Sequence, residues 1–179
     1  MLVNPVYLNG EGGDSDNPLT LVENFSELTD AFDLHKAITH VDVPNSVTTL
    51  HGQGLTTTRN ACFSNFIVLE SVSLPDTLTI VGEGAFMGCS SLKELVIPDG
   101  VTSLGVAAFY NCNSLETIVL PSGISSIPKQ CFAYCYRLKS IYYKGSESQW
   151  EALTKDTNWD LAMGNYVQGG TQVICNYTG

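Results

Sequence analysis

Cysteine and histidine are the residue types in this chain that could carry out covalent chemistry, with six cysteines and three histidines among 179 residues. A Cys–His hydrolase would need a thiol of lowered pKa and a histidine base within hydrogen-bond reach. Cys62 and Cys131 are candidates for the thiol, and His35, His40 and His51 lie near Cys62 in sequence. Both cysteines, however, occupy positions that hold alanine in otherwise similar segments of the chain. We therefore expect Cys62 and Cys131 to fill the core, because buried cysteine packs like a small hydrophobe.

Two other patterns could hold a metal ion, and both are incomplete. Cys89, Cys112 and Cys135 lie 23 residues apart, whereas structural zinc sites take their ligands from short local pairs. Asp14 and Asp16 could bind calcium, but their segment lacks the distal bidentate glutamate of an EF-hand loop. We therefore expect no metal, no cofactor and no enzymatic activity.

The 23-residue step of these cysteines extends to other residue types and reveals an internal repeat. Proline, phenylalanine and leucine recur in the same register as the cysteines. These columns are Pro75, Pro98 and Pro121; Phe63, Phe86, Phe109 and Phe132; and Leu69, Leu92, Leu115 and Leu138. The repeat predicts five equivalent strands, near residues 38–43, 69–74, 92–97, 115–120 and 138–143.

Each unit combines two hydrophobic periods. Leu95 and Ile97 follow the alternation of a strand, and Pro98 ends that strand because it has no amide hydrogen to donate. Phe109 and Cys112 then follow helix-like spacing, which predicts a short helical or 3₁₀ return. A single unit cannot bury its apolar edge alone, so neighbouring units must stack into a solenoid with a continuous core.

The repeated pattern, Leu-x-x-Ile-x-Ile-Pro-x-x-Val-x-x-Ile-Gly-x-x-Ala-Phe-x-x-Cys, resembles the leucine-rich repeats of the BspA type. The resemblance covers residues 62–143 and extends back to Ala31. It implies an α/β repeat solenoid of 23-residue units with its parallel strands on the concave face. Members of this family are typically secreted or surface-exposed interaction proteins, often bacterial, and are not enzymes. The resemblance therefore implies a cell-surface or secreted location, although residues 1–10 lack the features of a signal peptide.

Both ends of a solenoid need covers, because they expose core columns and strand edges. We expect an acidic segment over residues 1–20, a repeat array with its N-terminal cap over 21–145, and a C-terminal cap over 146–179. A Ser cap and apolar spacing predict a capping helix near residues 26–32. Ser146 and Gln149 form a capping-box pattern for a second short helix, and residues 171–177 alternate like a last strand. Eight extra residues within 51–60 are interpreted as a tolerated surface loop.

Charge and hydropathy exclude several partners. Eight Lys+Arg against 18 Asp+Glu give a formal net charge of −10, so we expect neither nucleic acid nor an anionic membrane surface as a ligand. No stretch approaches the roughly 18 consecutive apolar residues of a membrane span. With 44% hydrophobic residues, the chain can bury a substantial core.

The outward positions of the strands are the remaining place for a binding site. They form two rows: His40, Ser71, Glu94, Thr117 and Ser140; and Asp42, Ser73, Val96, Val119 and Tyr142. The second row becomes apolar toward the C-terminus, which predicts an exposed contact patch.

We expect Val96, Val119 and Tyr142, with Glu94 and Thr117 at the rim, to bind a macromolecular partner such as a protein or a host cell-surface or matrix component. Two other interpretations remain open. The β-branched residues could simply suit an exposed strand. The chain could also be a structural or oligomerisation domain that associates with itself.

Overall fold

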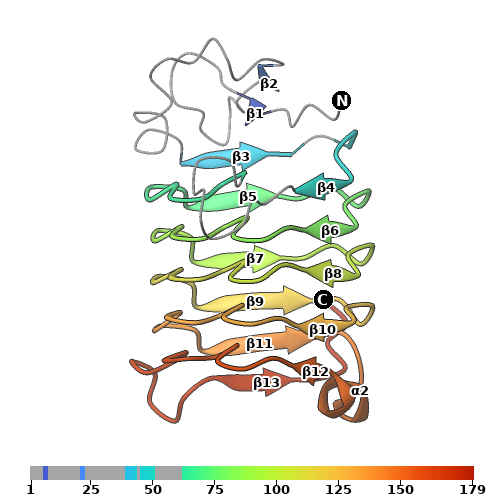
Figure 1. Ribbon diagram of the computed structural model, residues 1–179, viewed down its shortest axis with the longest axis vertical. Coiled ribbons are helices and arrows are strands. Elements are labelled where there is room, and N and C mark those ends of the chain that lie inside the picture. Colours follow the sequence, from blue (N-terminus) through green and yellow to red (C-terminus); the bar gives the residue numbers. More distant parts are fainter. Residues whose placement is uncertain (1–5, 8–20, 23–38, 44, 51–61) are drawn as a thin grey trace.

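The computed structural model describes residues 6–7, 21–22, 39–43, 45–50 and 62–179, and its coils stack along one axis (Figure 1). Each coil contributes one strand to a parallel series. The strands are β3 (His40–Asp42), β5 (Ser71–Ser73), β7 (Glu94–Val96), β9 (Thr117–Leu120), β11 (Ser140–Tyr143) and β13 (Gln172–Ile174). Hydrogen bonds join β3 to β5, and join β13, β11, β9 and β7 in that order. The five predicted strands and the predicted last strand are thus confirmed.

The register of these strands follows the sequence repeat. Glu94 pairs with Thr117, and Thr117 pairs with Ser140. Hydrogen-bonded side chains on neighbouring coils, such as Lys139 and Glu116, are 23 residues apart. His40 and Ser71 also face each other across β3 and β5, although 31 residues separate them. The eight additional residues therefore lengthen one coil without shifting its strand. The predicted loop itself, within 51–60, lies outside the described residues.

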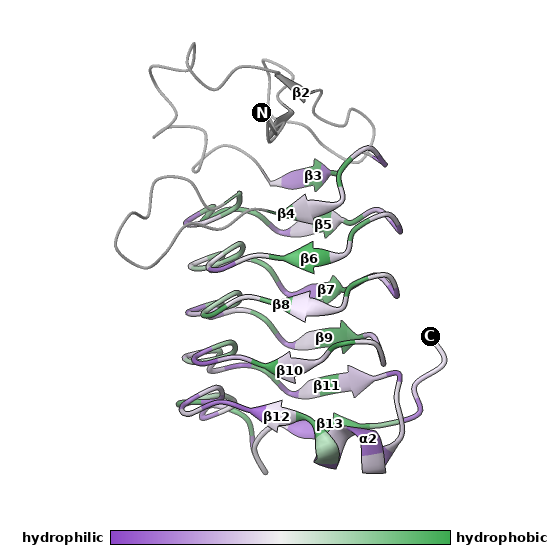
Figure 2. Cartoon of the chain, turned by 45° about the vertical axis from the view of Figure 1, so that its right-hand side comes forward, coloured by the Kyte–Doolittle hydropathy of each residue, from purple (hydrophilic) through white to green (hydrophobic). Residues whose placement is uncertain are grey.

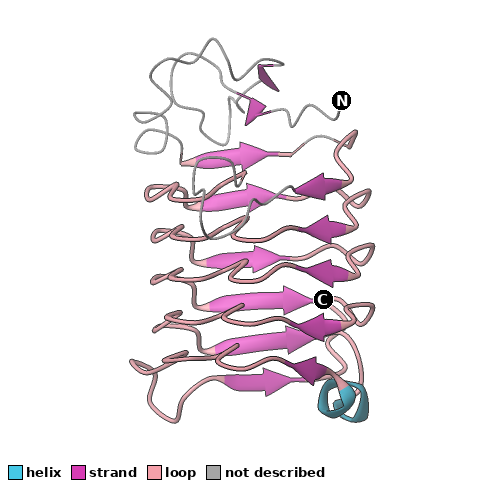
Figure 3. Cartoon of the chain, in the orientation of Figure 1, coloured by secondary structure: helices cyan, strands magenta, loops and turns pink. Residues whose placement is uncertain are grey.

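A second series of shorter strands runs behind the first (Figures 1 and 3). Each of these strands has two residues, and β6 is strongly hydrophobic in Figure 2. The series consists of β4 (Thr49–Leu50), β6 (Ile80–Val81), β8 (Ser103–Leu104), β10 (Ser126–Ile127) and β12 (Thr154–Lys155). β4, β6 and β8 pair in parallel, as do β10 and β12. This series could not be predicted from the sequence, because two residues are too few to display an alternation.

The prediction of helical or 3₁₀ returns is wrong. The returns are successive turns in which amides alternate between two kinds of acceptor. Phe86 N–H donates to Ala108 O of the next coil at 2.8 Å, whereas Cys89 N–H donates to Phe86 O within its own turn at 3.1 Å. Gly84 and Gly88 have φ of 62° and 75°. A helix needs negative φ throughout and consecutive amides bonded within the segment after its first turn, so these returns cannot be helical.

The core lies between the two strand series and the returns, and its regular feature is a stack of phenylalanine rings. Phe63, Phe86, Phe109 and Phe132 are buried, as predicted. Their ring centroids are 5.2, 5.7 and 5.3 Å apart, with interplanar angles of 17°, 8° and 5°. Each ring is therefore in contact with the equivalent ring of the next coil, so neighbouring coils share one continuous core.

The two ends of the chain differ from the array. β1 (Val6–Tyr7) and β2 (Leu21–Val22) pair antiparallel near the N-terminus, whereas the predicted helix near residues 26–32 lies outside the described residues. α2 (Glu147–Ala152) begins at the predicted capping box, in which Ser146 Oγ accepts from Gln149 N–H at 3.2 Å. Its role as a cover for the last coil stays a prediction, as do the domain boundaries. Within the described residues, no helix has the length and apolar character needed to cross a membrane.

Candidate binding surface

The cysteines of the repeat have a structural explanation. All six are thiols rather than disulfides. The thiols of the 23-residue column each donate to a phenylalanine carbonyl oxygen of the preceding coil at 3.0–3.1 Å. These pairs are Cys89 with Phe63, Cys112 with Phe86, and Cys135 with Phe109. Cysteine at this position therefore fills the core and also adds a second hydrogen bond to a carbonyl oxygen that already accepts a backbone amide.

The remaining cysteine and histidine candidates do not form a hydrolase site in the described part of the chain. Cys131 is fully buried, and burial raises the pKa of its thiol well above its ordinary value, whereas a nucleophile needs a lowered pKa. Cys62 is half-buried beside the core. His40 hydrogen-bonds Ser71, and His35 and His51 lie outside the described residues. Among the described residues, no three His, Cys, Asp or Glu side chains cluster as metal ligands.

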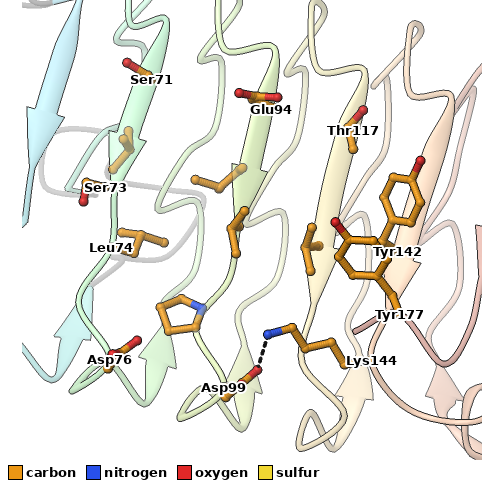
Figure 4. A pocket seen from close by; sticks show the side chains of 15 residues that line it. Ser71, Ser73, Leu74, Asp76, Glu94, Asp99, Thr117, Tyr142, Lys144 and Tyr177 are labelled. Atoms are coloured by element: carbon orange, nitrogen blue, oxygen red, sulfur yellow. Dashed lines mark hydrogen bonds and ion pairs between the residues drawn. The ribbon is translucent and has the colours of Figure 1, made fainter. Parts of the chain in front are cut away.

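A groove on the face of the parallel sheet brings the predicted site residues together (Figure 4). Its volume is about 490 Å³, and it runs across strands β5, β7, β9 and β11. The five residues expected to contact a partner all line it: Val96, Val119, Tyr142, Glu94 and Thr117. We call this feature the sheet groove.

The apolar row in the sheet groove is not uniformly exposed, and the prediction of an exposed Val119 is wrong. Val96 is 57% exposed, but Val119 on the next strand is 6% exposed. Val119 pairs in register with Tyr142, whose ring contacts that of Tyr177 at a centroid distance of 4.6 Å. Two tyrosine rings therefore stand at this end of the row, next to a buried Val119.

Tyr177 reaches the sheet groove because the C-terminal segment turns back along β11. Asn176 adopts a φ of 58°, and its amide donates to Gly145 O at 2.8 Å. The amide of Tyr177 then donates to Tyr143 O at 3.2 Å. Tyr177 falls within the predicted last strand, but its place in the groove could not be predicted, because the strand ends at Ile174 and the segment then turns outside the 23-residue register.

Charged side chains border the apolar centre of the groove. Glu94 lies on one side, and Asp76 and Asp99 lie on the opposite side (Figure 4). Lys144 Nζ forms an ion pair with Asp99 Oδ1 at 2.8 Å. The lining therefore carries three carboxylates and one ammonium group.

A second surface, which we call the tyrosine edge, lies where the returns lead into the strands. It consists of Tyr110, Tyr134, Tyr136 and Tyr166. The centroid distances along this chain of rings are 5.1, 5.9 and 5.0 Å. Tyr166 is 76% exposed and lines a second groove of about 450 Å³ together with Arg137 and Lys139.

The backbone at Tyr134 is unusual for a bulky side chain. Its φ is 62°, and the equivalent positions of other coils hold Asn65, Gly88 and Asn111, residue types that tolerate positive φ. A tyrosine in a column of asparagine and glycine is a signal that is visible in the sequence alone. The tyrosine edge is therefore the main alternative to the sheet groove.

Comparison with known proteins shows which proteins share this architecture. Residues 56–153 match the BspA type leucine rich repeat region in six copies. A leucine-rich repeat protein from Bacteroides ovatus is 35% identical, with a TM-score of 0.53 over 63% of this chain and 27% of that one. A leucine rich cell surface protein from Faecalibacterium prausnitzii is 29% identical, with a TM-score of 0.55 over 65% of this chain and 35% of that one.

A leucine rich repeat protein from T. pallidum is 25% identical, with a TM-score of 0.53 over 68% of this chain and 57% of that one. The chain thus spans less than two thirds of each of these three structures. A search of curated proteins finds no match. With the repeat model covering more than half of its length, the chain belongs to the BspA-type leucine-rich repeat family.

Proposed function

We propose that this protein is a non-enzymatic binding module that holds a macromolecular partner, a protein in the first place, in the sheet groove. The observation that carries the proposal is the combination of an exposed Val96 with the Tyr142–Tyr177 ring pair on one groove wall. Exposed aromatic side chains on a rigid support give a large contact area at a small cost in conformational entropy.

The backbone around the groove is held from both sides, which favours preorganised binding. β9 pairs with β7 and with β11, and the stacked phenylalanine rings lie on the inner side of the sheet. A surface that is already ordered loses little entropy when a partner binds. By the resemblance to BspA-type repeats we expect these strands on the concave face, and we take that face as the recognition surface.

A cell-surface or secreted location is part of the same proposal. It is supported by the family and by the similarity to the Faecalibacterium prausnitzii protein, which is described as a cell surface protein. A partner on a host cell or in the extracellular matrix would then be accessible.

The test is binding of the whole chain to a panel of purified extracellular-matrix proteins, measured by surface plasmon resonance. For any panel member that binds, Val96→Asp and Tyr142→Ala should each weaken binding by at least about 1–2 kcal/mol. Val96→Asp should keep the melting curve of the parent protein, because Val96 is exposed. Tyr142→Ala should stay folded and lose only the stability of its ring contact with Tyr177, about 0.5–1.5 kcal/mol.

Ile80→Asp provides the matched control. Ile80 is a β-branched residue that is 40% exposed, but it lies on β6 in the other strand series. Its substitution should leave the affinity unchanged. Equal losses in the control and in the two groove variants would indicate a general effect on the surface and would contradict the proposal. Loss of binding in Tyr166→Ala with both groove variants unaffected would move the site to the tyrosine edge.

Self-association is the second candidate function, and the last strand of the sheet favours it. β13 is hydrogen-bonded to β11 on one side and ends the order of its sheet, and Val173 and Ile174 are 36% and 37% exposed. An exposed edge with apolar side chains can pair with another strand. Concentration-dependent mass in light scattering, abolished by Val173→Lys, would support this function, whereas a constant monomer mass would exclude it.

A further inference from the structure

We propose that the sheet groove selects a partner segment in which basic side chains flank an apolar or aromatic one. This inference rests on the proposed function and adds the chemical class of the partner. It follows from how the charges are distributed around the apolar centre of the groove.

The carboxylates of the groove are not neutralised by the protein itself. Lys144 is paired with Asp99, so this lysine and this carboxylate largely cancel. Glu94 and Asp76 form no ion pair with any residue that the structure describes, and both are exposed. Two negative charges therefore remain in the groove without a counter-charge from the protein.

The geometry separates these two carboxylates across the apolar centre. Glu94 and Val96 lie on the same strand two residues apart, so their side chains share the outer face at a spacing of about 6–7 Å. Asp76 follows the end of β5 and lies on the opposite side of the groove from Glu94 (Figure 4). A segment crossing the groove from Glu94 to Asp76 would thus meet a carboxylate, the apolar centre and a second carboxylate, with the tyrosine pair at one end of the groove.

The charge of the whole molecule acts in the same direction. With a net charge of −10, the protein attracts basic partners and repels acidic ones over a distance of about a Debye length. Once the segment is bound, its contacts with Glu94 and Asp76 determine which partner sequence binds more tightly. An acidic segment would instead bring like charges together on both sides of the apolar centre.

The experiment uses three synthetic 15-residue peptides that carry one central tryptophan flanked by lysines, glutamines or glutamates. Fluorescence anisotropy with the whole chain measures their affinities. The lysine peptide should bind at least about tenfold more tightly than the glutamine peptide, and the glutamate peptide should bind most weakly. In the double variant Glu94→Gln with Asp76→Asn, the preference for lysine over glutamine should fall to about threefold or less.

The control double variant is Glu151→Gln with Asp160→Asn. It removes the same two charges from exposed positions outside the groove, so the net charge of the two double variants is equal. The control should keep the full preference for the lysine peptide. A similar loss of preference in both double variants would mean that net charge alone attracts the peptide, and this would overturn the inference.

A further variant, Tyr142→Ala, separates this inference from the proposed function. If Tyr142→Ala weakens binding of the glutamine peptide while lysine and glutamine peptides bind equally well, the groove binds but does not select charge, and the inference fails alone. If the lysine peptide binds but neither Tyr142→Ala nor the groove double variant affects it, both proposals fail. Absence of lysine-peptide binding at up to about 1 mM would also contradict the inference.

Discussion

The interior and the outer face of the same sheet use the same 23-residue step in opposite ways. Inside, one residue type recurs at each step, so that phenylalanine rings from four coils stack nearly parallel. On the outer face, the residue type in the row through the groove changes at three of its four steps. It reads Asp42, Ser73, Val96, Val119 and Tyr142.

The difference shows which part of each coil is constrained by its neighbours. An interior side chain must fit against the equivalent side chain above and below it, so a change in one coil creates a cavity or a clash. An outward side chain meets solvent, as the 57% exposure of Val96 shows. The array can therefore keep its fold while its outer face varies, which is the property that a binding surface needs.

Phe109→Ala should cause the largest loss of stability. Phe109 is fully buried between Phe86 and Phe132, so its loss should lower the free energy of unfolding by about 3–5 kcal/mol. Val96→Thr is the matched change on the outer face and should stay within about 0.5 kcal/mol of the parent. Urea denaturation measures both. A loss below about 1 kcal/mol for Phe109→Ala would contradict the stacked interior.

Gly105→Ala should break the stacking at a place where two backbones meet. A Cβ at residue 105 would lie 2.2 Å from Glu83 N and 2.3 Å from Gly82 C, both backbone atoms of the preceding coil. The coils would have to separate locally, and we expect a loss of about 1–3 kcal/mol in urea denaturation. Gly123→Ala is the control, because the nearest atom to its Cβ is 3.7 Å away. Equal stability of the two variants would refute the close approach.

Buried thiols should make the interior sensitive to alkaline pH. Burial raises the pKa of Cys89, Cys112 and Cys131 above the ordinary value of 9.0. Above that pH, these thiols lose their protons in the unfolded state and keep them in the folded state. Stability is therefore full below about pH 9 and falls above it, by at most about 1.4 kcal/mol per pH unit for each thiol.

Cys112→Ala checks the origin of this pH dependence. The variant should lose stability less steeply than the parent between about pH 9 and pH 10, because one titrating thiol is gone. Urea denaturation at a series of pH values gives both slopes. Identical slopes would assign the alkaline loss to other groups.

Among the substitutions expected to destabilise the protein, Tyr177→Ala should have the smallest effect, and it should sharpen the contrast between Val96 and Val119. Loss of the Tyr142–Tyr177 ring contact should lower the free energy of unfolding by about 0.5–1.5 kcal/mol. The methyl resonances of Val119 should shift in the variant, whereas those of the already exposed Val96 should change little. Unchanged Val119 methyl signals would show that Tyr177 does not contribute to covering this residue.

The front strands and the phenylalanine column could be predicted because both depend on a repeat that is visible in the sequence. The alternation at Leu95 and Ile97 predicted a strand that ends before Pro98, and β7 is that strand. The recurrence of phenylalanine predicted a buried column, and the four rings are buried. The capping box at Ser146 and Gln149 was likewise a local pattern with a local consequence.

The returns were mispredicted because a spacing of three residues fits both a helix and a series of turns. Phe109 and Cys112 are buried in either case. What decides between them is that alternate amides bond to the next coil, and a single unit read alone does not contain that information. The exposure of Val119 was mispredicted for a similar reason, because strand alternation alone does not say which other segments pack near an outward residue.

The most direct test of the sheet groove as the binding surface is a titration of the isotope-labelled whole chain with the lysine-flanked tryptophan peptide, followed through backbone amide chemical shifts. We predict that the largest shifts fall on residues 71–76, 94–99, 117–119 and 142–144 and on Tyr177, with the tyrosine edge unaffected. Shifts concentrated at Tyr110, Tyr134, Tyr136 and Tyr166, with the groove amides unmoved, would contradict the account.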